Sequence, residues 1–453
     1  MRYILCADFG STYSKLTAVD LQTREILATS KAYTTIETHI LDGYNNALAE
    51  LEAKIGKLEY DRRLAASSAA GGLKMIAVGL VPSLTSNAAK MAASSAGAKL
   101  MATYSYELSG AEAAAIEAAK PDILLLSGGI DGGNKDVILH NAKVLAGLAH
   151  DMPVIVAGNK SAAEQARDTL EAGGKPVIVV ENVMPRFGEL NIMPAKSAIR
   201  DLFISRIVSA KGLDDAQAIM SAEIVPTPLA VFEACELLAC KGELMAVDVG
   251  GATTDVYSMT DGTPTGANTI EKGLKEPFAK RSVEGDLGVR YSVPSLVGEA
   301  GLEALAANAG LDPAEVSGWL DAVCRDTSVV AERGTPGAAV DDELAASCVG
   351  ISVARHAGRL ESVYTVLGEM MIQTGKDLGG VQILIGTGGS VINSPGAENI
   401  LRRALATAED PFALLPRNPR LVIDTGNILT AMGLLSGINR DAALAIMSRE
   451  FGL

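Results

Sequence analysis

The sequence is short of positive charge and of long apolar runs. Its 453 residues hold 39 Lys and Arg against 54 Asp and Glu, a formal net charge of −15. A protein that binds nucleic-acid phosphates needs clustered basic residues, so we expect no nucleic acid among its partners. Because no apolar run reaches about 18 residues and no signal sequence stands at the start, we expect a cytoplasmic protein that does not enter a membrane.

Cysteine is also scarce. The five cysteines are odd in number, form no CxxC pair and lie mostly in apolar runs, so we expect them to be buried, reduced thiols. They are Cys6, Cys235, Cys240, Cys324 and Cys348. What the chain does have is apolar content: at 48% hydrophobic residues, it is long enough to bury a large core and to form two or three domains.

Two similar glycine-containing segments lie far apart in the chain. Residues 8–15 (DFGSTYSK) and 248–255 (DVGGATTD) each follow an apolar run, begin with aspartate, turn at glycine and lead into a second strand. Glycine lets main-chain N–H groups converge on an anion, and a strand-end aspartate can hold a divalent cation through its water shell. One such segment is typical of an ordinary hairpin, but two copies indicate two related halves that could grip a nucleotide triphosphate.

The surrounding patterns predict an α/β fold. Residues 1–60 have the pattern of three strands followed by a helix, and residues 61–72 that of a connector. From residue 73 to about 207, short continuous apolar runs alternate with alanine-rich helical stretches. This alternation predicts a doubly wound parallel sheet that is covered on both faces.

Two loops are candidates for contact with a partner. Residues 126–134 (LSGGIDGGN) follow a strand and precede a helix, where an anion or a protein could bind, but GxGxxG is absent and a plain βα turn remains open. Residues 272–291 have the pattern of a charged, glycine-interrupted loop, either functional or a solvated surface connection. The candidate partner residues are Gly128, Gly129, Asp131, Glu284 and Asp286.

The last third of the chain has a mostly helical pattern. It predicts a long helix over residues 341–375, then a strand that runs into residues 386–391 (GTGGSV). Glycines at a strand-to-helix turn remove the side chains that would keep a flat ring off the backbone, so this segment is a candidate adenosine site. A simple turn is the alternative.

The three glycine-containing segments resemble the phosphate-1, phosphate-2 and adenosine motifs of one superfamily, which includes sugar kinases, Hsp70-type chaperones and actin. They also follow one another in the same order as those motifs. The resemblance implies two RNase H-like ATPase domains, with ATP and Mg²⁺ in the cleft between them. The implied domains are a first ATPase domain at residues 1–72, the doubly wound insertion at 73–210, a connecting segment of the first domain at 211–243, a second ATPase domain at 244–424, and C-terminal helices at 425–453, of which 425–435 return towards the first domain.

The same resemblance implies the site residues. Asp8 and Asp248 would be catalytic and would hold Mg²⁺ mostly through water. The residues implied for the ATP phosphates are Gly10, Ser11, Thr12, Lys15, Gly250, Gly251, Ala252 and Thr253. Those implied for adenosine are Gly386, Gly388, Gly389 and Ser390. Val225 stands where Hsp70-type proteins have a water-positioning glutamate, with Glu223 two residues earlier, so we expect slow hydrolysis unless Glu223 substitutes.

Beyond the superfamily, the whole chain resembles the MutL-type accessory proteins of adenosylcobalamin-dependent glutamate mutase. Residues 6–20, 126–134 and 283–288 carry this resemblance. It implies a reactivating factor that uses ATP to open a mutase holding damaged cobalamin, so that intact cofactor can enter. A homo-oligomer is a possible form of such a factor. The chain has no DxHxxG motif that would supply a cobalamin-ligating histidine.

Three other functions use the same motifs. A small-molecule kinase would need an acidic base beside a polar substrate pocket, which the sequence does not reveal. An activator of 2-hydroxyacyl-CoA dehydratase would need cysteines that bridge an iron–sulfur cluster between two subunits. An actin-like filament protein would use ATP only to control assembly.

Overall fold

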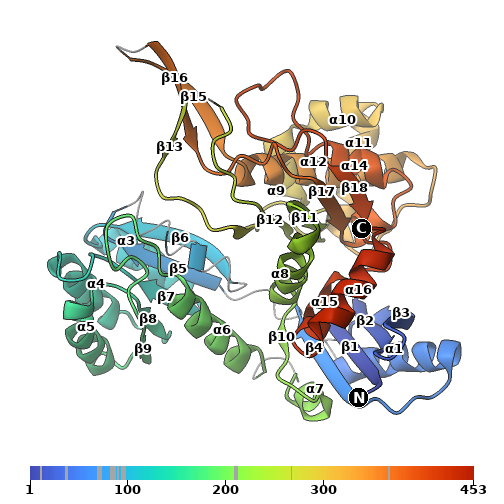
Figure 1. The fold of residues 1–453 in the computed structure, drawn as a ribbon, viewed down its shortest axis with the longest axis horizontal. Helices are drawn as coiled ribbons and strands as arrows, with labels where there is room; N and C mark the ends of the chain where they lie inside the picture. Colours follow the sequence, from blue (N-terminus) through green and yellow to red (C-terminus); the bar gives the residue numbers. More distant parts are fainter. Residues whose placement is uncertain are drawn as a thin grey trace. The chain divides into compact units, whose positions relative to one another are not determined.

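The computed structural model describes residues 1–10, 13–35, 39–68, 74–81, 88, 91–92, 98–208, 213–266, 268–365 and 368–453. Ser11 and Thr12, both predicted to contact phosphate, therefore lie outside the described residues. The chain divides into two compact units, Met1–Ala230 and Val231–Leu453, whose elements are labelled in Figure 1. Each unit is built on its own sheets, and each is described by itself.

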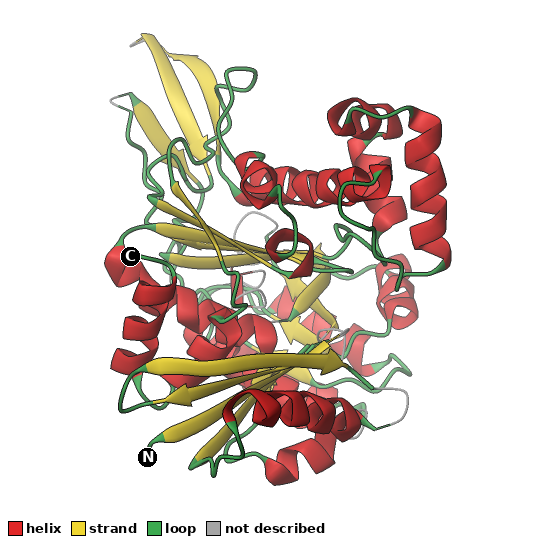
Figure 2. Cartoon of the chain, turned by 90° about the vertical axis from the view of Figure 1, so that its right-hand side faces the viewer, coloured by secondary structure: helices red, strands yellow, loops and turns green. Residues whose placement is uncertain are grey.

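The first sheet of unit 1 has the strand order β10-β4-β1-β2-β3. Neighbours are antiparallel from β1 to β3 and parallel from β1 through β4 to β10. The bounds are β1 (Tyr3–Phe9), β2 (Tyr13–Asp20), β3 (Glu25–Tyr33), β4 (Arg62–Ser67) and β10 (Val225–Pro226). The helix α1 (Ile40–Ile55) packs against β2 and β3 (Figure 2).

The predicted connector at residues 61–72 is wrong, because Arg62–Ser67 form the strand β4 beside the central strand β1. Its Leu64, Ala65 and Ala66 are buried. Alanine has a low intrinsic preference for strands, so the sequence hides this element. Pairing on both sides, with β1 and β10, makes it a strand.

The main sheet of unit 2 repeats this arrangement. Its order is β14-β12-β11-β17-β18, antiparallel from β11 to β14 and parallel from β11 through β17 to β18. The bounds are β11 (Leu244–Val249), β12 (Thr254–Met259), β14 (Ala279–Glu284), β17 (Ile383–Thr387) and β18 (Arg420–Ile423). Taken in chain order, both sheets read 3-2-1-4-5 with the same directions, which confirms the predicted pair of RNase H-like halves.

The second sheet of unit 1 is entirely parallel, with the order β6-β5-β7-β8-β9. Its strands are β5 (Lys74–Gly79), β6 (Lys99–Ser105), β7 (Ile123–Leu126), β8 (Val154–Val156) and β9 (Val177–Val179). The helices among and after them are α3 (Gly110–Ala119), α4 (Asp136–Ala146), α5 (Lys160–Ala172) and α6 (Met193–Val208). Strands and helices share one buried apolar core, and the predicted doubly wound insertion is confirmed.

The remaining helices lie mostly in unit 2, where those around α12 share an apolar core with β11 and β12. The chain reaches this unit through α7 (Leu213–Ile219), α8 (Thr227–Leu238) and the short 3-10 helix η1 (Ala239–Lys241). The others are α9 (Val293–Ala300), α10 (Leu302–Ala309), α11 (Pro313–Arg325), α12 (Pro336–His356), α13 (Gly389–Ile392), α14 (Ala397–Arg402), α15 (Leu429–Ser436) and α16 (Arg440–Glu450).

The predicted helix over residues 341–375 is wrong in its second half. The helix α12 ends at His356, and β15 (Arg359–Thr365) and β16 (Gly368–Thr374) form a hairpin that pairs with β13 (Thr269–Lys272). Gly358 marks the break: a Cβ there would lie 2.5 Å from the main chain of Gly375, so only glycine lets the hairpin close. Figures 1 and 2 show this small sheet projecting from the rest of unit 2.

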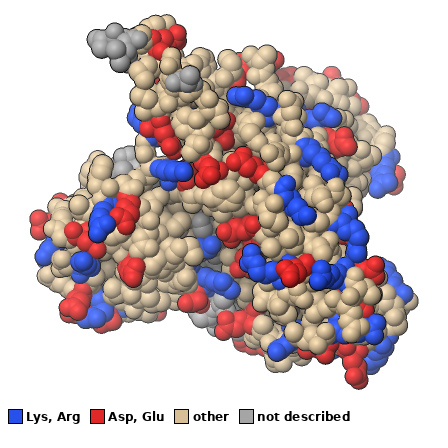
Figure 3. Space-filling model, viewed as in Figure 1, with Lys and Arg blue, Asp and Glu red and all other residues tan. Residues whose placement is uncertain are grey.

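The surface has mixed charge. On the face in Figure 3, the drawn Lys and Arg side chains are interspersed with Asp and Glu and form no continuous basic area. Among the described helices, none combines the length and the apolar character that crossing a membrane requires.

A buried lysine lies at the base of the projecting sheet. Lys376 is 1% exposed, and its Nζ donates to the main-chain oxygens of Thr260 at 2.8 Å and Phe278 at 2.7 Å. Burial lowers the pKa of Lys376 to about 7, although the nearby carboxylate of Glu276 acts in the opposite direction. Folding therefore favours the neutral amine.

This burial predicts a pH-dependent stability. The folded pKa of Lys376 is about 7 and its ordinary value is 10.5, so between these values the unfolded chain binds more protons and stability rises with pH. We expect the free energy of unfolding of the wild type, minus that of Lys376→Met, to rise by up to about 1.4 kcal/mol per pH unit from pH 7 to 9. Urea unfolding at several pH values measures this difference in free energy, and Lys241→Met, at an exposed lysine, is the control. A difference for Lys376→Met that does not vary with pH would contradict the prediction.

Candidate functional site

The two predicted turns have the same main-chain geometry. In the β1–β2 hairpin, Gly10 N–H donates to Tyr13 O at 3.1 Å; in the β11–β12 hairpin, Gly250 N–H donates to Thr253 O at 2.9 Å. A Cβ on either glycine would lie within 2.9 Å of that acceptor oxygen, so glycine is required at both places. The two predicted hairpin tips are confirmed, and each sets an aspartate on the central strand of its half, one residue before the end of that strand.

Asp8 lies in a small polar cluster within unit 1. Its side chain is mostly buried, its Oδ1 accepts a 2.7 Å hydrogen bond from the Thr227 hydroxyl, and its Oδ2 lies 3.8 Å from Lys15 Nζ. Lys15 stands opposite Asp8 in the hairpin register and keeps 35% of its side chain exposed. The structure thus brings Asp8 and Lys15 together, with one face of the cation open to a ligand.

Thr227 is a site residue that the sequence analysis missed. It is the first residue of α8 and follows the two-residue strand β10, which pairs with β4. The available signal was the Pro-Thr pair at the start of the connecting helix. Glu223 is exposed and precedes β10, whereas Val225 is half-buried in it. Within unit 1, a threonine rather than Glu223 therefore contacts Asp8.

Asp248 has polar neighbours within unit 2. It pairs in register with Thr387 on β17, whose hydroxyl lies 3.1 Å from Asp424 Oδ2 and 3.3 Å from Asn427 Oδ1. Asp424 is fully buried and accepts from the main-chain N–H groups of Ile428 and Leu429 at the start of α15. The carboxylate of Asp424 is held by these donors, and Asp248, which is half-buried, is the more accessible of the two acids.

The predicted adenosine turn lies beside Asp248. Gly388 has φ +91°, and a Cβ on it would lie 2.3 Å from Val249 O and 2.7 Å from Asp248 Oδ1. Gly386 packs against Leu401, whereas a Cβ on Gly389 would meet only Asn393, at 3.9 Å. A pocket of about 440 Å³ begins just after the turn; its lining is Ile392, Ser394, Pro395, Gly396, Ala397, Glu398, Asn399, Ile423 and Thr425.

The two hairpins differ in the residue opposite the aspartate. Lys15 faces Asp8, but Asp255 faces Asp248, and two carboxylates in that position repel each other. Arg281 on β14 binds Asp255 Oδ1 through Nε at 2.9 Å and Nη2 at 2.5 Å, and both side chains are buried. Burial lowers the pKa of Arg281, but Asp255 outweighs it and raises the pKa above its ordinary value. The cation that offsets Asp255 therefore comes from β14 and is buried in the structure.

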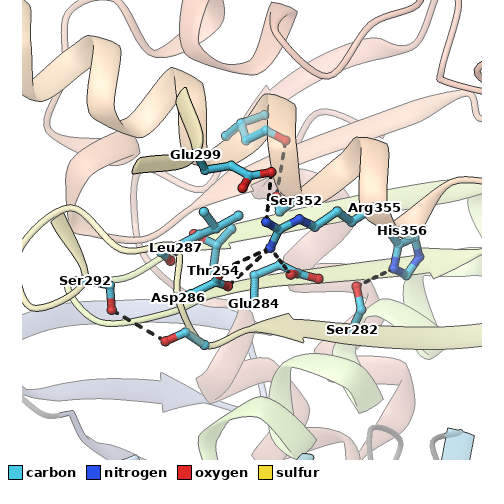
Figure 4. Close-up of polar contacts among 12 residues, drawn as sticks. Thr254, Ser282, Glu284, Asp286, Leu287, Ser292, Glu299, Ser352, Arg355 and His356 are labelled. Atoms are coloured by element: carbon cyan, nitrogen blue, oxygen red, sulfur yellow. Dashed lines mark hydrogen bonds and ion pairs between the residues drawn. The ribbon is translucent and has the colours of Figure 1, made fainter. Parts of the chain in front are cut away.

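The predicted loop at residues 272–291 is only partly a loop, because Ala279–Glu284 form the strand β14. We call residues 284–292 the strap. Its Val289 N–H donates to Gly250 O at 3.2 Å, and the N–H groups of Arg290 and Tyr291 both donate to Gly251 O at 2.8 Å. Ser292 Oγ donates to Ala252 O at 2.6 Å (Figure 4). The strap therefore packs directly against the second turn.

Glu284 and Asp286 are predicted to contact a partner. In the structure, both side chains form ion pairs with an arginine of the same chain. Arg355 near the end of α12 contacts Glu284 at 2.8 Å, Asp286 at 3.2 Å and Glu299 on α9 at 3.1 Å (Figure 4). Desolvation lowers the pKa of Arg355, but these carboxylates raise it above its ordinary value. A role for Glu284 and Asp286 in partner contact stays a prediction.

The glycine-rich loop after β7 is held by its own side chains. Gly128 and Gly129 have φ of +144° and +72° and are buried. Asp131 Oδ1 accepts from Lys160 N–H at the start of α5 and from Asn182 Nδ2, both at 3.0 Å. A carboxylate of the loop thus binds the first turn of α5, while Ile130 points outward with 39% exposure.

The comparisons with known proteins decide the family. The family model described as MutL protein matches residues 4–451. The chain belongs to the MutL protein family. It is 42% identical over 454 residues to Protein MutL of Clostridium tetanomorphum, with 98% of each chain covered. The family resemblance found in the sequence is thereby confirmed.

Solved structures also resemble this MutL-family chain at low similarity. One is component A of (R)-2-hydroxyglutaryl-CoA dehydratase from Acidaminococcus fermentans, with a TM-score of 0.32, 11% identity and 99% of each chain covered. Another is xylulose kinase from Lactobacillus acidophilus, with a TM-score of 0.35, 10% identity and coverage of 99% of this chain and 92% of the kinase. At these TM-scores, neither likeness bears on the function of the MutL-family chain.

The cysteines of the MutL-family chain are partly as expected. Cys6, Cys235 and Cys348 are buried, but the expectation is wrong for Cys240 and Cys324, which are exposed. Both lie near the ends of helical segments, where an apolar run reaches the surface. Burial raises the pKa of Cys6 and of Cys348 to about 12. Within the described ranges, no three His, Cys, Asp or Glu side chains gather as a metal site would require.

Substitutions at Gly388 and Gly389 provide a matched test of the structure around Asp248. We expect Gly388→Ala to lower the free energy of unfolding by about 2 kcal/mol or more, because its positive φ and its contact with Val249 and Asp248 exclude a side chain. Gly389→Ala has open space, so we expect it to change stability by about 0.5 kcal/mol at most. Urea unfolding compares them, and equal effects of the two changes would contradict this placement.

Proposed function

We propose that this protein is an ATP-dependent reactivating factor for an adenosylcobalamin-dependent mutase, with glutamate mutase as the first candidate. The observation that carries the proposal is the pair of glycine turns with the same hydrogen bond, each on the central strand of a half with the same topology. Membership of the MutL protein family supports the choice of partner. An accessory protein of a mutase has no need of a substrate pocket of its own.

The proposed nucleotide site uses both turns. The main-chain N–H groups around residues 10–12 and 250–253 would cradle the β- and γ-phosphates, and Lys15 would add a fixed cation. Asp8 and Asp248 would hold Mg²⁺ mostly through water, since that ion gives up its hydration shell reluctantly. The bound metal would neutralise charge on the phosphates.

Hydrolysis is proposed to be slow. Phosphoryl transfer depends on positioning and charge neutralisation, and Val225 supplies no group that could orient water. Thr227 binds Asp8 Oδ1 at 2.7 Å and Lys15 Nζ lies 3.8 Å from Oδ2, so Asp8 would be held in place to orient a water molecule of the metal shell. A residue that orients water without an optimal base gives low turnover, which suits a switch better than a metabolic kinase.

Work on a partner requires that the ATP and ADP states bind it differently. Loss of the γ-phosphate would remove contacts that both turns make with the nucleotide. We propose that this change alters how the protein contacts the mutase, and that the doubly wound insertion carries this contact. As a result, the cofactor site of the bound mutase would open.

The proposed partner loop is residues 127–134, at the carboxyl end of the parallel sheet. Its glycines and Asp131 hold the loop, as described above, so the contact itself falls to exposed side chains. On the loop itself, Ile130 is 39% exposed; outside it, Phe187 and Met193 are 77% and 60% exposed. Asp131 N–H donates to Pro185 O at 3.0 Å, which ties the loop to the segment that carries Phe187. Apolar side chains on a rigid loop favour a protein partner.

A reactivation assay tests the proposal. Glutamate mutase inactivated by turnover is mixed with this protein, ATP, Mg²⁺ and fresh adenosylcobalamin, and we expect mutase activity to return only when ATP is present. Asp8→Asn and Asp248→Asn should stay folded by circular dichroism but lose at least about tenfold of ATP hydrolysis and reactivation. Reactivation without ATP, or wild-type rates in both variants, would overturn the function.

The partner loop is tested by one side chain. We expect Ile130→Gln to weaken binding to immobilised, cobalamin-damaged glutamate mutase about tenfold, the loss typical of one apolar anchor. Met101→Gln, at an exposed methionine on the edge strand β6 of the same sheet, should bind as the wild type does. Surface plasmon resonance measures both affinities, and unchanged binding of Ile130→Gln would remove the loop from the interface.

A further inference from the structure

The strap fixes the direction of the peptide groups in the second turn. Its hydrogen bonds engage the carbonyl oxygens of Gly250, Gly251 and Ala252. In a planar trans peptide, the N–H of the next residue points away from that carbonyl. The N–H groups of Gly251, Ala252 and Thr253 are therefore directed away from the strap, towards the side of the turn where an anion would lie.

Close contact between strap and turn depends on one glycine. A Cβ on Gly288 would lie 2.4 Å from the carbonyl carbon of Ala252, which is shorter than any real contact. Thr254 Oγ1 also donates to Leu287 O at 2.9 Å, so the strand that leaves the turn is tied to the strap as well. The turn and the strap can move only together.

The strap is anchored at two places on the helix α12. Arg355 holds its beginning through Glu284 and Asp286 (Figure 4), and Asp341 holds its end through Arg290, with N–O distances of 3.1 and 2.8 Å. Fourteen helical residues separate these anchors, about 21 Å at 1.5 Å per residue. Two anchors so far apart fix the direction of the strap as well as its position.

We propose that Arg355 is a positioning residue for nucleotide: by holding the strap against the second turn, it keeps the turn's N–H groups aimed at the phosphates. The inference rests on the proposed function, because it assumes that these phosphates belong to ATP. Arg355 itself touches no phosphate in this arrangement. Its effect passes through Glu284 and Asp286 to the strap, and from the strap to Gly250, Gly251 and Ala252.

The test compares two arginines of unit 2. Arg355→Met removes the strap anchor. Arg359→Met removes an ion pair with Asp410, at 2.6 and 3.1 Å, which does not involve the strap. We expect Arg355→Met to weaken Mg–ATP binding at least tenfold by isothermal titration calorimetry and Arg359→Met to leave it unchanged, with similar melting temperatures without nucleotide. Arg355→Lys keeps the charge but not the planar fork, so it should recover part of the lost affinity.

Each outcome of this experiment supports or overturns a stated proposal. Wild-type affinity in Arg355→Met, or an equal loss in Arg359→Met, would overturn the positioning role. If Arg355→Met does not fold, Asp286→Asn loosens the same anchor at a half-exposed side chain, and we expect about a threefold loss of affinity; no loss would again overturn the role. Absence of ATP binding by the wild type would instead overturn the proposed function.

Discussion

One main-chain hydrogen bond, made once in each half, sets the geometry on which the rest of the structure depends. Gly10 N–H to Tyr13 O and Gly250 N–H to Thr253 O close four-residue turns. Each turn ends the central strand of its sheet, so parallel neighbours lie on one side of the aspartate and an antiparallel neighbour on the other. The central place in the sheet holds the aspartate rigidly, and the glycine leaves the approach to it free of side chains.

The two halves keep this geometry but support it differently. In unit 1, the first residue of α8 supplies a hydroxyl that binds Asp8 directly. In unit 2, the turn is braced by a separate segment, which α12 holds at both ends. Gly388 adds a further close contact at Asp248. A shared topology therefore fixes where the site lies, and residues outside the repeat decide how firmly each turn is held.

Elements encoded by short segments of the sequence could be predicted, whereas elements that depend on contacts between distant residues could not. The hairpin turns and the parallel insertion are encoded in short runs, so they could be predicted from residues 8–15 and 248–255 and from alternating apolar segments. The strand β4 could not, because its alanines become a strand only between two partners. The hairpin after α12 was missed for a similar reason, since Gly358 shows its role only against Gly375. Thr227 lies 219 residues from Asp8, and Arg355 lies 71 residues from Glu284, and no pattern in one sequence reveals such pairs.

The exchange of Lys15 for Asp255 has an electrostatic consequence for ligand binding. The first turn offers a phosphate a partly exposed ammonium group beside Asp8. Beside the second hairpin, the nearby cation is Arg281 on β14, which is buried and bound to Asp255, so it offsets the carboxylate from inside the structure. In the proposed nucleotide site, recognition by the second turn would then fall to main-chain N–H groups, whose attraction for an anion depends on their direction. The hairpin with Asp255 in place of Lys15 is thus the one whose turn is braced by the strap, and in the proposed site the direction of its backbone N–H groups would matter most.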